Sequence, residues 1–242
     1  MYTAKDRMII ALDFSTMNEA IELIDKIADG ATFYKVGLEL FLNSKGEIIE
    51  YLAKKGKKVF LDLKFHDIPN TTAMASVFAA KQNVFMFNVH ASGGKKMMKK
   101  VVEESKKVNG DNLIIGVTIL TSLSEEDIEE TFNSKYSLKE LALNLANLAK
   151  ESGLDGVVCS PWEAMSIKEK CGKDFKTVCP GVRPQWAATN DQQRIMTPKD
   201  AIKNGCDFLV VGRPITKSEN PLKAAKMVEE EIFEGMKEAG LC

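Results

Sequence analysis

Three charged side chains, Asp62, Lys64 and Asp67, follow a short apolar segment, residues 59–61. In an extended strand, residues two apart point to the same side, so we expect Asp62 and Lys64 to share a face. Burying such charges is costly unless they are paired, which makes a working site a better interpretation than simple packing. Neighbouring carboxylates favour the ammonium form of a lysine, so the pattern indicates that Lys64 is a proton donor.

A second lysine, Lys35, interrupts the apolar run 33–37. Two interpretations are open. The side chain reaches solvent at the rim of the sheet while its stem packs on apolar neighbours, or its ammonium group pairs with the carboxylate of Asp13 or Asp62. The second interpretation would join Lys35 to the same charged site.

Short apolar segments alternate with amphipathic segments along the whole chain of 242 residues. We expect strands near 8–12, 32–37, 58–63, 84–89, 113–119, 155–159, 176–180 and 207–211. We expect helices near 17–28, 44–55, 71–81, 94–107, 137–151, 161–170, 198–204 and 221–238. The strands read as continuous apolar runs, which is typical of parallel strands covered on both faces.

Eight strand–helix units in a chain of this length predict a single domain, residues 1–242, with the fold of a (β/α)8 TIM barrel. A doubly wound open sheet is the structural alternative. That fold normally carries a glycine-rich turn after its first strand, whereas this chain has Asp-Phe-Ser-Thr at 13–16. The sequence therefore favours the barrel.

A barrel of this kind collects its chemistry at the carboxyl ends of the strands. Polar residues occur at these ends in all eight predicted units: Asp13, Lys35, Asp62 with Lys64, His90, Thr118 with Thr121, Ser160, Arg183 and Arg213. Their repetition predicts one shared site for a polar ligand.

Two features of the last third of the chain predict how a phosphate would bind. Gly212 and Arg213 follow the final strand, where barrels often bind phosphate through backbone amides, and Arg213 can add a bidentate contact. The connection 181–196, which includes Arg183 and Gln192, is long enough to be a lid over the site.

Composition excludes several classes of protein. The 33 basic and 34 acidic residues give a net charge of −1, which argues against a nucleic-acid-binding protein. No apolar run reaches membrane-spanning length. The five cysteines are scattered without a CxxC pair, which indicates a reduced, cytoplasmic protein. The two histidines lack zinc-site spacing, so we expect no metal.

Taken together, these motifs resemble those of the orotidine 5′-phosphate decarboxylases, and the resemblance covers essentially the whole chain. The matching segments are Ile-Ala-Leu-Asp at 10–13, Lys-Val-Gly at 35–37, Leu-Asp-Leu-Lys-Phe-His-Asp-Ile-Pro-Asn-Thr at 61–71, Val-His-Ala-Ser-Gly-Gly at 89–94, Leu-Thr-Ser at 120–122, Pro-Gly-Val-Arg-Pro at 180–184, Asp-Gln-Gln-Arg-Ile-Met-Thr-Pro at 191–198 and Val-Val-Gly-Arg-Pro-Ile at 210–215. The Asp-x-Lys-x-x-Asp motif alone is shared with related sugar-phosphate barrels, but the Ile-Pro-Asn-Thr that follows it is more specific.

The resemblance implies decarboxylation of orotidine 5′-phosphate to UMP without a cofactor, with Lys64 as the proton donor to C6. In the site that it implies, Asp13, Lys35 and Thr71 hold the ribose, and Asp62, Lys64 and Asp67 form the charged network around the scissile carboxylate. Thr121 contacts the pyrimidine edge. The phosphate is held by Gln192, Arg213 and the amide of Gly212, and Arg183 supports the closed lid. It also implies a homodimer in which Asp67 and Thr71 reach the partner's site.

Two alternatives to this activity remain open. One is a magnesium-dependent 3-keto-sugar-phosphate decarboxylase or aldolase on the same barrel, which would need an acidic metal site. The other is a catalytically silent nucleotide-binding barrel, which should have lost a member of the set Asp62, Lys64 and Asp67.

Overall fold

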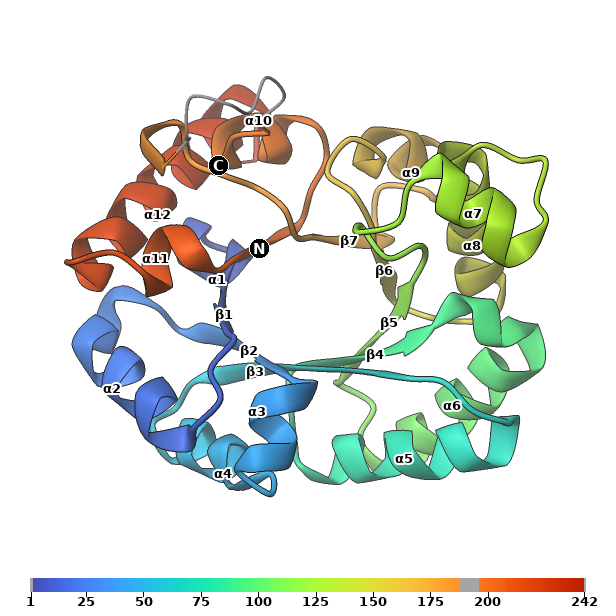
Figure 1. Ribbon diagram of the computed structural model, residues 1–242, viewed down its shortest axis with the longest axis horizontal. Helices are drawn as coiled ribbons and strands as arrows, with labels where there is room; N and C mark the ends of the chain where they lie inside the picture. Colours follow the sequence, from blue (N-terminus) through green and yellow to red (C-terminus); the bar gives the residue numbers. More distant parts are fainter. Residues whose placement is uncertain (1, 188–195, 242) are drawn as a thin grey trace. The chain divides into compact units, whose positions relative to one another are not determined.

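Eight parallel strands follow one another in sequence order and close into a barrel, which Figure 1 traces from β1 to β8. The computed structural model of the chain describes residues 2–187 and 196–241. The strands are β1 (Met8–Leu12), β2 (Phe33–Gly37), β3 (Lys58–Phe65), β4 (Met86–His90), β5 (Leu113–Val117), β6 (Gly156–Val158), β7 (Lys176–Cys179) and β8 (Phe208–Val211). The predicted barrel fold is confirmed.

Helices follow the strands, as the alternation of the sequence predicts. They are α1 (Ala4–Arg7), α2 (Met17–Ile27), α3 (Leu38–Asn43), α4 (Glu47–Lys54), α5 (Pro69–Lys81), α6 (Gly94–Val108), α7 (Glu125–Phe132), α8 (Leu138–Glu151), α9 (Ala164–Cys171), α10 (Pro198–Lys203), α11 (Arg213–Thr216) and α12 (Pro221–Glu238), with short 3-10 turns η1 (Ala28–Gly30), η2 (Ala91–Gly93) and η3 (Gln185–Ala187).

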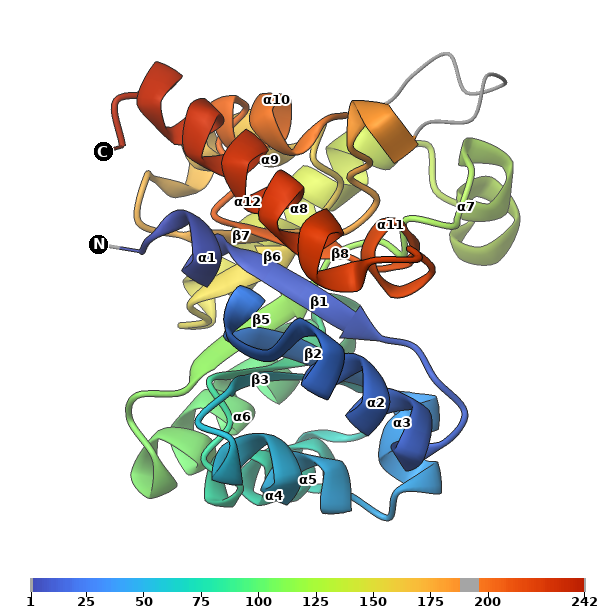
Figure 2. The same ribbon diagram turned by 90° about the vertical axis from the view of Figure 1, so that its left-hand side faces the viewer.

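The contacts divide the chain into two units, and the first comprises Met1–Leu63 and Gly181–Cys242. In this unit β1 pairs with both β2 and β8, and every residue of β1 and β8 is buried. Helix α12 packs against α1, α2, α10 and α11, and Figure 2 shows it running beside α1. This unit therefore places the ends of β1, β2 and β8 around one buried core.

The second unit comprises Lys64–Pro180. Strands β4, β5, β6 and β7 pair in that order, with His90 opposite Val117 and Val117 opposite Val158. Helix α6 packs against α5 and α8, and α8 against α9. The register brings the carboxyl ends of β4, β5 and β6 to the same level.

Several helices differ from the expected elements. The helix predicted over 44–55 is α4, which begins only at Glu47 because Lys45 and Gly46 adopt positive φ values of 50° and 81°. The short helices α1, α3 and α11 were not predicted. Helix α7 was not predicted, since Ile128 is its one buried residue and its sequence has no apolar periodicity.

Within residues 2–187 and 196–241, no helix is long and apolar enough to cross a bilayer. Cys159, Cys171, Cys179 and Cys206 are buried and form no disulfide within the described part of the chain, as expected of small apolar side chains.

Candidate active site

The ammonium group of Lys35 pairs with two carboxylates at the carboxyl ends of neighbouring strands. Its Nζ lies 2.8 Å from Asp13 Oδ1 and 3.5 Å from Asp62 Oδ2. The Lys35 side chain is 11% exposed, so it does not extend into solvent at the rim. A buried ammonium needs such partners to offset its lost hydration. The interpretation that Lys35 pairs with Asp13 or Asp62 is confirmed, and it pairs with both.

Two glycines lie close to this ion cluster. A Cβ at Gly37 would come within 3.1 Å of Lys35 Nζ, so the absence of a side chain leaves room for the lysine. A Cβ at Gly212 would lie 3.9 Å from Asp13 Oδ2. The turn between β8 and α11, which ends in the exposed Arg213, is therefore beside Asp13. Residues from the ends of β1, β2, β3 and β8 meet here.

The connection 181–196 is held at both of its described ends. The backbone N–H of Arg183 donates to the carbonyl of Met196 at 3.0 Å. The side chain of Trp186, in η3, forms a hydrogen bond with Glu231 of α12; burial raises the pKa of Glu231, and this bond acts against the increase. Gln192, predicted to bind phosphate, lies outside the described residues.

Lys64 is in β3, two residues after Asp62, but its backbone is not that of a regular strand. Its φ is +51°, in the left-handed region that residues other than glycine rarely adopt. The expectation that Asp62 and Lys64 share a strand face depends on regular alternation, and the backbone at Lys64 departs from it.

The backbone N–H of Lys64 donates a 2.8 Å hydrogen bond to Oδ1 of Asn88 in β4. Asn88 is completely buried. Asn88 is not among the site residues predicted from the sequence. The signal for it in the sequence is one amide side chain in the otherwise apolar run 84–89, because a buried amide normally forms hydrogen bonds.

Asp67 and Thr71 are exposed and lie just after β3 and in the first turn of α5. Oδ1 of Asp67 accepts a hydrogen bond from the N–H of Ile68 at 2.6 Å. Among the described residues Asp67 forms no ion pair. Within one chain, Asp67 therefore does not join the charged cluster that the sequence pattern suggests.

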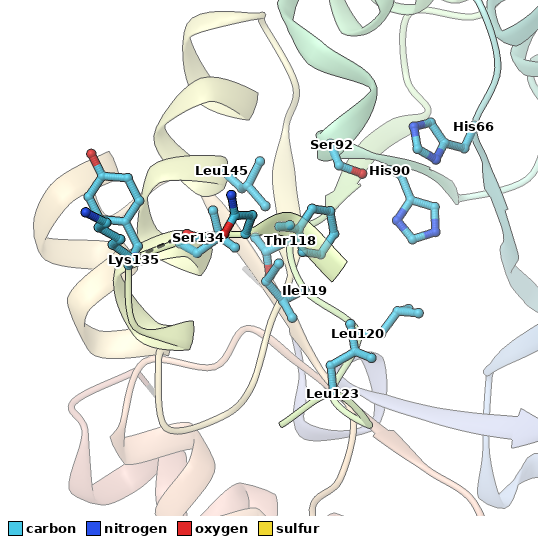
Figure 3. Close-up of a pocket in the computed structure, with 14 residues that line it drawn as sticks. His66, His90, Ser92, Thr118, Ile119, Leu120, Leu123, Ser134, Lys135 and Leu145 are labelled. Carbon is cyan, nitrogen blue, oxygen red and sulfur yellow. Dashed lines mark hydrogen bonds between the residues drawn. The ribbon is translucent and has the colours of Figure 1, made fainter. Parts of the chain in front are cut away.

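A cavity of about 900 Å³ opens in the second unit, at the carboxyl ends of β4 and β5 (Figure 3). His66, His90 and Thr118 form part of its polar side, and the two imidazole rings are 5.2 Å apart. Away from the histidines the lining is mixed. Its apolar members are Ile119, Leu120, Leu123, Phe132, Leu141 and Leu145, and Asn133, Ser134 and Lys135 add polar groups. Thr121, between Leu120 and Leu123 in the chain, is exposed.

No group of three or more His, Cys, Asp or Glu side chains in residues 2–187 and 196–241 could hold a metal ion. The acidic residues that do gather, Asp13 and Asp62, both contact Lys35.

A closed parallel barrel with polar side chains at the carboxyl ends of its strands defines the class of (β/α)8 barrel enzymes. Residues 6–228 match the model of the orotidine 5′-phosphate decarboxylase / HUMPS family. The orotidine 5′-phosphate decarboxylase of Syntrophomonas wolfei is 46% identical over 96% of this chain and 99% of its own.

Solved structures agree with the sequence comparisons. The crystal structure of orotidine 5′-phosphate decarboxylase from Lactobacillus acidophilus matches with a TM-score of 0.83 and 36% identity, covering 93% of this chain and 98% of its own. The enzyme from Methanocaldococcus jannaschii, solved with the inhibitor BMP, matches with a TM-score of 0.74 and 27% identity over the same shares of the two chains. The chain belongs to the orotidine 5′-phosphate decarboxylase / HUMPS family.

Proposed function

We propose that this chain converts orotidine 5′-phosphate to UMP and CO2 in pyrimidine biosynthesis, without a cofactor, and that Lys64 protonates C6. The decarboxylation itself rests on one observation: the near full-length match, at 46% identity, to a curated protein named for that reaction. The family description covers both the orotidine 5′-phosphate decarboxylases and the HUMPS group. The similar curated relatives are named orotidine 5′-phosphate decarboxylases, which favours the first of these groups. The chain is a carboxy-lyase.

The chemical step needs a stabilised carbanion. When the bond between C6 and the carboxylate breaks, its electron pair stays on C6, and no carbonyl is placed to accept it. CO2 departs, and the Lys64 ammonium then gives its proton to C6. The resulting neutral amine of Lys64 regains a proton from solvent. Before that transfer, its fixed positive charge stabilises the developing carbanion. Asp62 faces the departing carboxylate.

Asp13, Lys35 and Thr71 hold the ribose hydroxyls in this proposal. The 2.8 Å contact between Lys35 and Asp13 supports it, because the pair presents a donor and an acceptor at fixed positions. Arg213 and the amide of Gly212 bind the phosphate together with Gln192, and Arg183 supports the closed connection 181–196. The closeness of Gly212 to Asp13 supports a phosphate bound next to the ribose.

Thr121 contacts the polar edge of the pyrimidine. The proposal is supported by the position of Thr121 between Leu120 and Leu123, both of which line the cavity of the second unit. A pyrimidine ring would bury its faces against such apolar side chains and keep its polar edge for the hydroxyl and backbone of this turn.

The active form is a homodimer in which Asp67 and Thr71 serve the partner's site. Two observations support this. Asp67 makes no ion pair within the described part of its own chain. Apolar side chains close to it in sequence are exposed in the single chain: Ile68 is 68% exposed, Met74 47% and Phe78 41%. An apolar face of this kind is typical of a surface that a second subunit covers.

The remaining parts of the proposal concern domain organisation and location. Residues 1–242 form one barrel domain, since strands of both units follow one another in a single closed barrel. The enzyme works in the cytoplasm, a proposal supported by cysteines that are scattered along the sequence and form no disulfide among the described residues.

The test is the ultraviolet absorbance of orotidine 5′-phosphate mixed with the purified protein in the presence of EDTA. Loss of the orotidylate spectrum with formation of UMP is the expected result. Activity that EDTA abolishes would favour the magnesium-dependent alternative. An unchanged spectrum together with a Trp186 fluorescence response to UMP would favour the silent nucleotide-binding barrel.

A further inference from the structure

The backbone of Lys64 is held in a conformation that its residue type disfavours. A φ of +51° places Lys64 in the left-handed region within β3. For an L-residue with a Cβ this conformation is sterically disfavoured, and it persists only where the surroundings impose it. The conformation also sets the direction in which the side chain leaves the strand.

The group that contacts this backbone is the Asn88 side chain. In a regular parallel pair the N–H of a strand residue donates to a main-chain carbonyl of the next strand. At Lys64 the acceptor is instead Oδ1 of Asn88, at 2.8 Å. Asn88 has no exposed surface, and its neighbours in β4, Phe87 and Val89, are buried and apolar. A buried amide is costly unless it is bonded, so this contact is strongly favoured.

We propose that Asn88 is a positioning residue for the proton transfer: its Oδ1 fixes the peptide of Lys64 in the left-handed conformation and thereby directs the ammonium group toward C6. The inference rests on the proposed function, because it assigns Asn88 a role only through Lys64. Asn88 itself does not exchange a proton.

The reaction is sensitive to such positioning. A donor displaced by about 1 Å loses on the order of 10²-fold in rate even when substrate binding is intact. Loss of the Asn88 acceptor leaves the Lys64 N–H without this partner and allows the peptide to return to extended geometry. The ammonium group would then start from a different point on the strand. Ribose and phosphate binding, which use other residues, should change little.

The experiment compares Asn88→Ala with Asn88→Asp, which keeps an oxygen at the Oδ1 position. We expect Asn88→Ala to lower kcat on the order of 10²-fold, with a KM for orotidine 5′-phosphate within a few-fold of wild type. We expect Asn88→Asp to recover a measurable part of kcat. A role confined to stability would not divide kcat from KM in this way, nor respond to the restored acceptor.

The matched control is Asn112→Ala. Asn112 is also a buried asparagine of the second unit, and its amide donates to the backbone carbonyl of Val84, near the opposite ends of β4 and β5. We expect this variant to lose stability but keep kcat. UMP binding by each variant, measured by titration calorimetry, reports whether the site is folded.

Three results would overturn the inference. Asn88→Ala could keep the wild-type kcat, or it could lose UMP binding as well, which would make its role structural. Asn112→Ala could lower kcat as much as Asn88→Ala does. In each of these cases an active wild type leaves the proposed function intact. A wild-type protein without decarboxylase activity would instead overturn the proposed function and this inference together.

Discussion

At the scale of single residues, two lysines of the candidate site show different constraints, one in its side chain and one in its backbone. Lys35 is buried between Asp13 and Asp62, and Gly37 leaves room for its ammonium group. The three groups hold one another in place, because loss of either carboxylate would leave the buried ammonium charge of Lys35 poorly compensated. Lys64 is held differently, by its backbone, with a positive φ and a hydrogen bond to Asn88. In the proposed function the two lysines have different roles: Lys35 holds the ribose and Lys64 donates the proton.

The strain at Lys64 predicts an unusual order of stabilities. Glycine adopts a φ of +51° without the steric cost that alanine meets there. We expect Lys64→Gly to be more stable than Lys64→Ala by about 1 kcal/mol, measured by urea denaturation. In a regular strand position the order would be reversed, because glycine weakens a strand. Equal stabilities, or a more stable alanine variant, would contradict the assigned conformation.

Arg213 is the residue for which we expect a loss of binding without a loss of chemistry. Removing a charge-assisted contact to phosphate should cost about 1.5–3 kcal/mol, so Arg213→Ala should raise KM on the order of 10–100-fold with a smaller change in kcat. Lys217→Ala removes an exposed positive charge at the other end of α11 and serves as the control. A fall in kcat with an unchanged KM would place Arg213 in the chemical step instead.

At the scale of elements, the strands were predictable and the short helices were not. The eight apolar runs identify β1 to β8 to within two residues at each end, because buried parallel strands leave a continuous apolar signature. Helix α11, with four residues, is too short to show a periodic pattern. The break between α3 and α4 depends on positive φ values at Lys45 and Gly46, of which only the glycine is visible as a signal in the sequence.

The sequence predicts correctly the location of those site residues whose place follows from their position along a strand. The rule that barrel chemistry gathers at strand ends places Asp13, Lys35 and Asp62 correctly beside one another. It does not indicate the conformation of Lys64, which depends on a hydrogen bond to Asn88, 24 residues further along the chain. A tertiary contact of this kind overrides the local preference of the strand, and no local pattern contains it.

The connection between β6 and α9 carries a buried acid whose titration should be visible in stability. Glu163 is 7% exposed, and its Oε2 accepts the N–H of Ser160 at 2.9 Å. Burial raises the pKa of Glu163, while the Ser160 bond and Lys139 act against the increase. A carboxyl pKa higher in the folded than in the unfolded chain adds stability below the unfolded value, and this stability is lost as pH rises through the folded value.

We therefore expect Glu163→Gln, which keeps the acceptor oxygen but cannot ionise, to be more stable than wild type near neutral pH. The difference should vanish at pH values below the ordinary carboxyl range. Urea denaturation at both pH values measures it, with Glu130→Gln on the exposed surface of α7 as the control. A wild type that gains stability relative to Glu163→Gln as pH rises would contradict the raised pKa.

At the scale of the whole molecule, the proposed dimer divides one site between two chains. Asp67 and Thr71 are exposed close to the apolar side chains of Ile68, Met74 and Phe78, and a subunit that covers this face would take both polar residues into its own site. Such an interface is isologous, so each chain completes the other's site.

Sharing of this kind predicts recovery of activity on mixing two inactive variants. Lys64→Ala and Asp67→Ala each disable both sites of their homodimers, but a mixed dimer has one site in which Lys64 and Asp67 are both intact. After unfolding and refolding together in equal amounts, roughly a quarter of the wild-type activity should return, since random pairing makes half of the dimers mixed. The two proteins refolded separately are the control. No recovery, with mixed dimers demonstrated by a size-tagged chain, would place Asp67 in its own subunit's site.

The most direct test of the account is kcat for Lys64→Ala against wild type, followed by the loss of the orotidylate absorbance with EDTA present. The account predicts that turnover nearly disappears, while UMP still binds because ribose and phosphate contacts involve other residues. Removing a general acid alone typically costs about 10²–10⁴-fold, and here the same ammonium also stabilises the carbanion. A Lys64→Ala protein with turnover close to wild type would contradict the assignment of Lys64 as the proton donor.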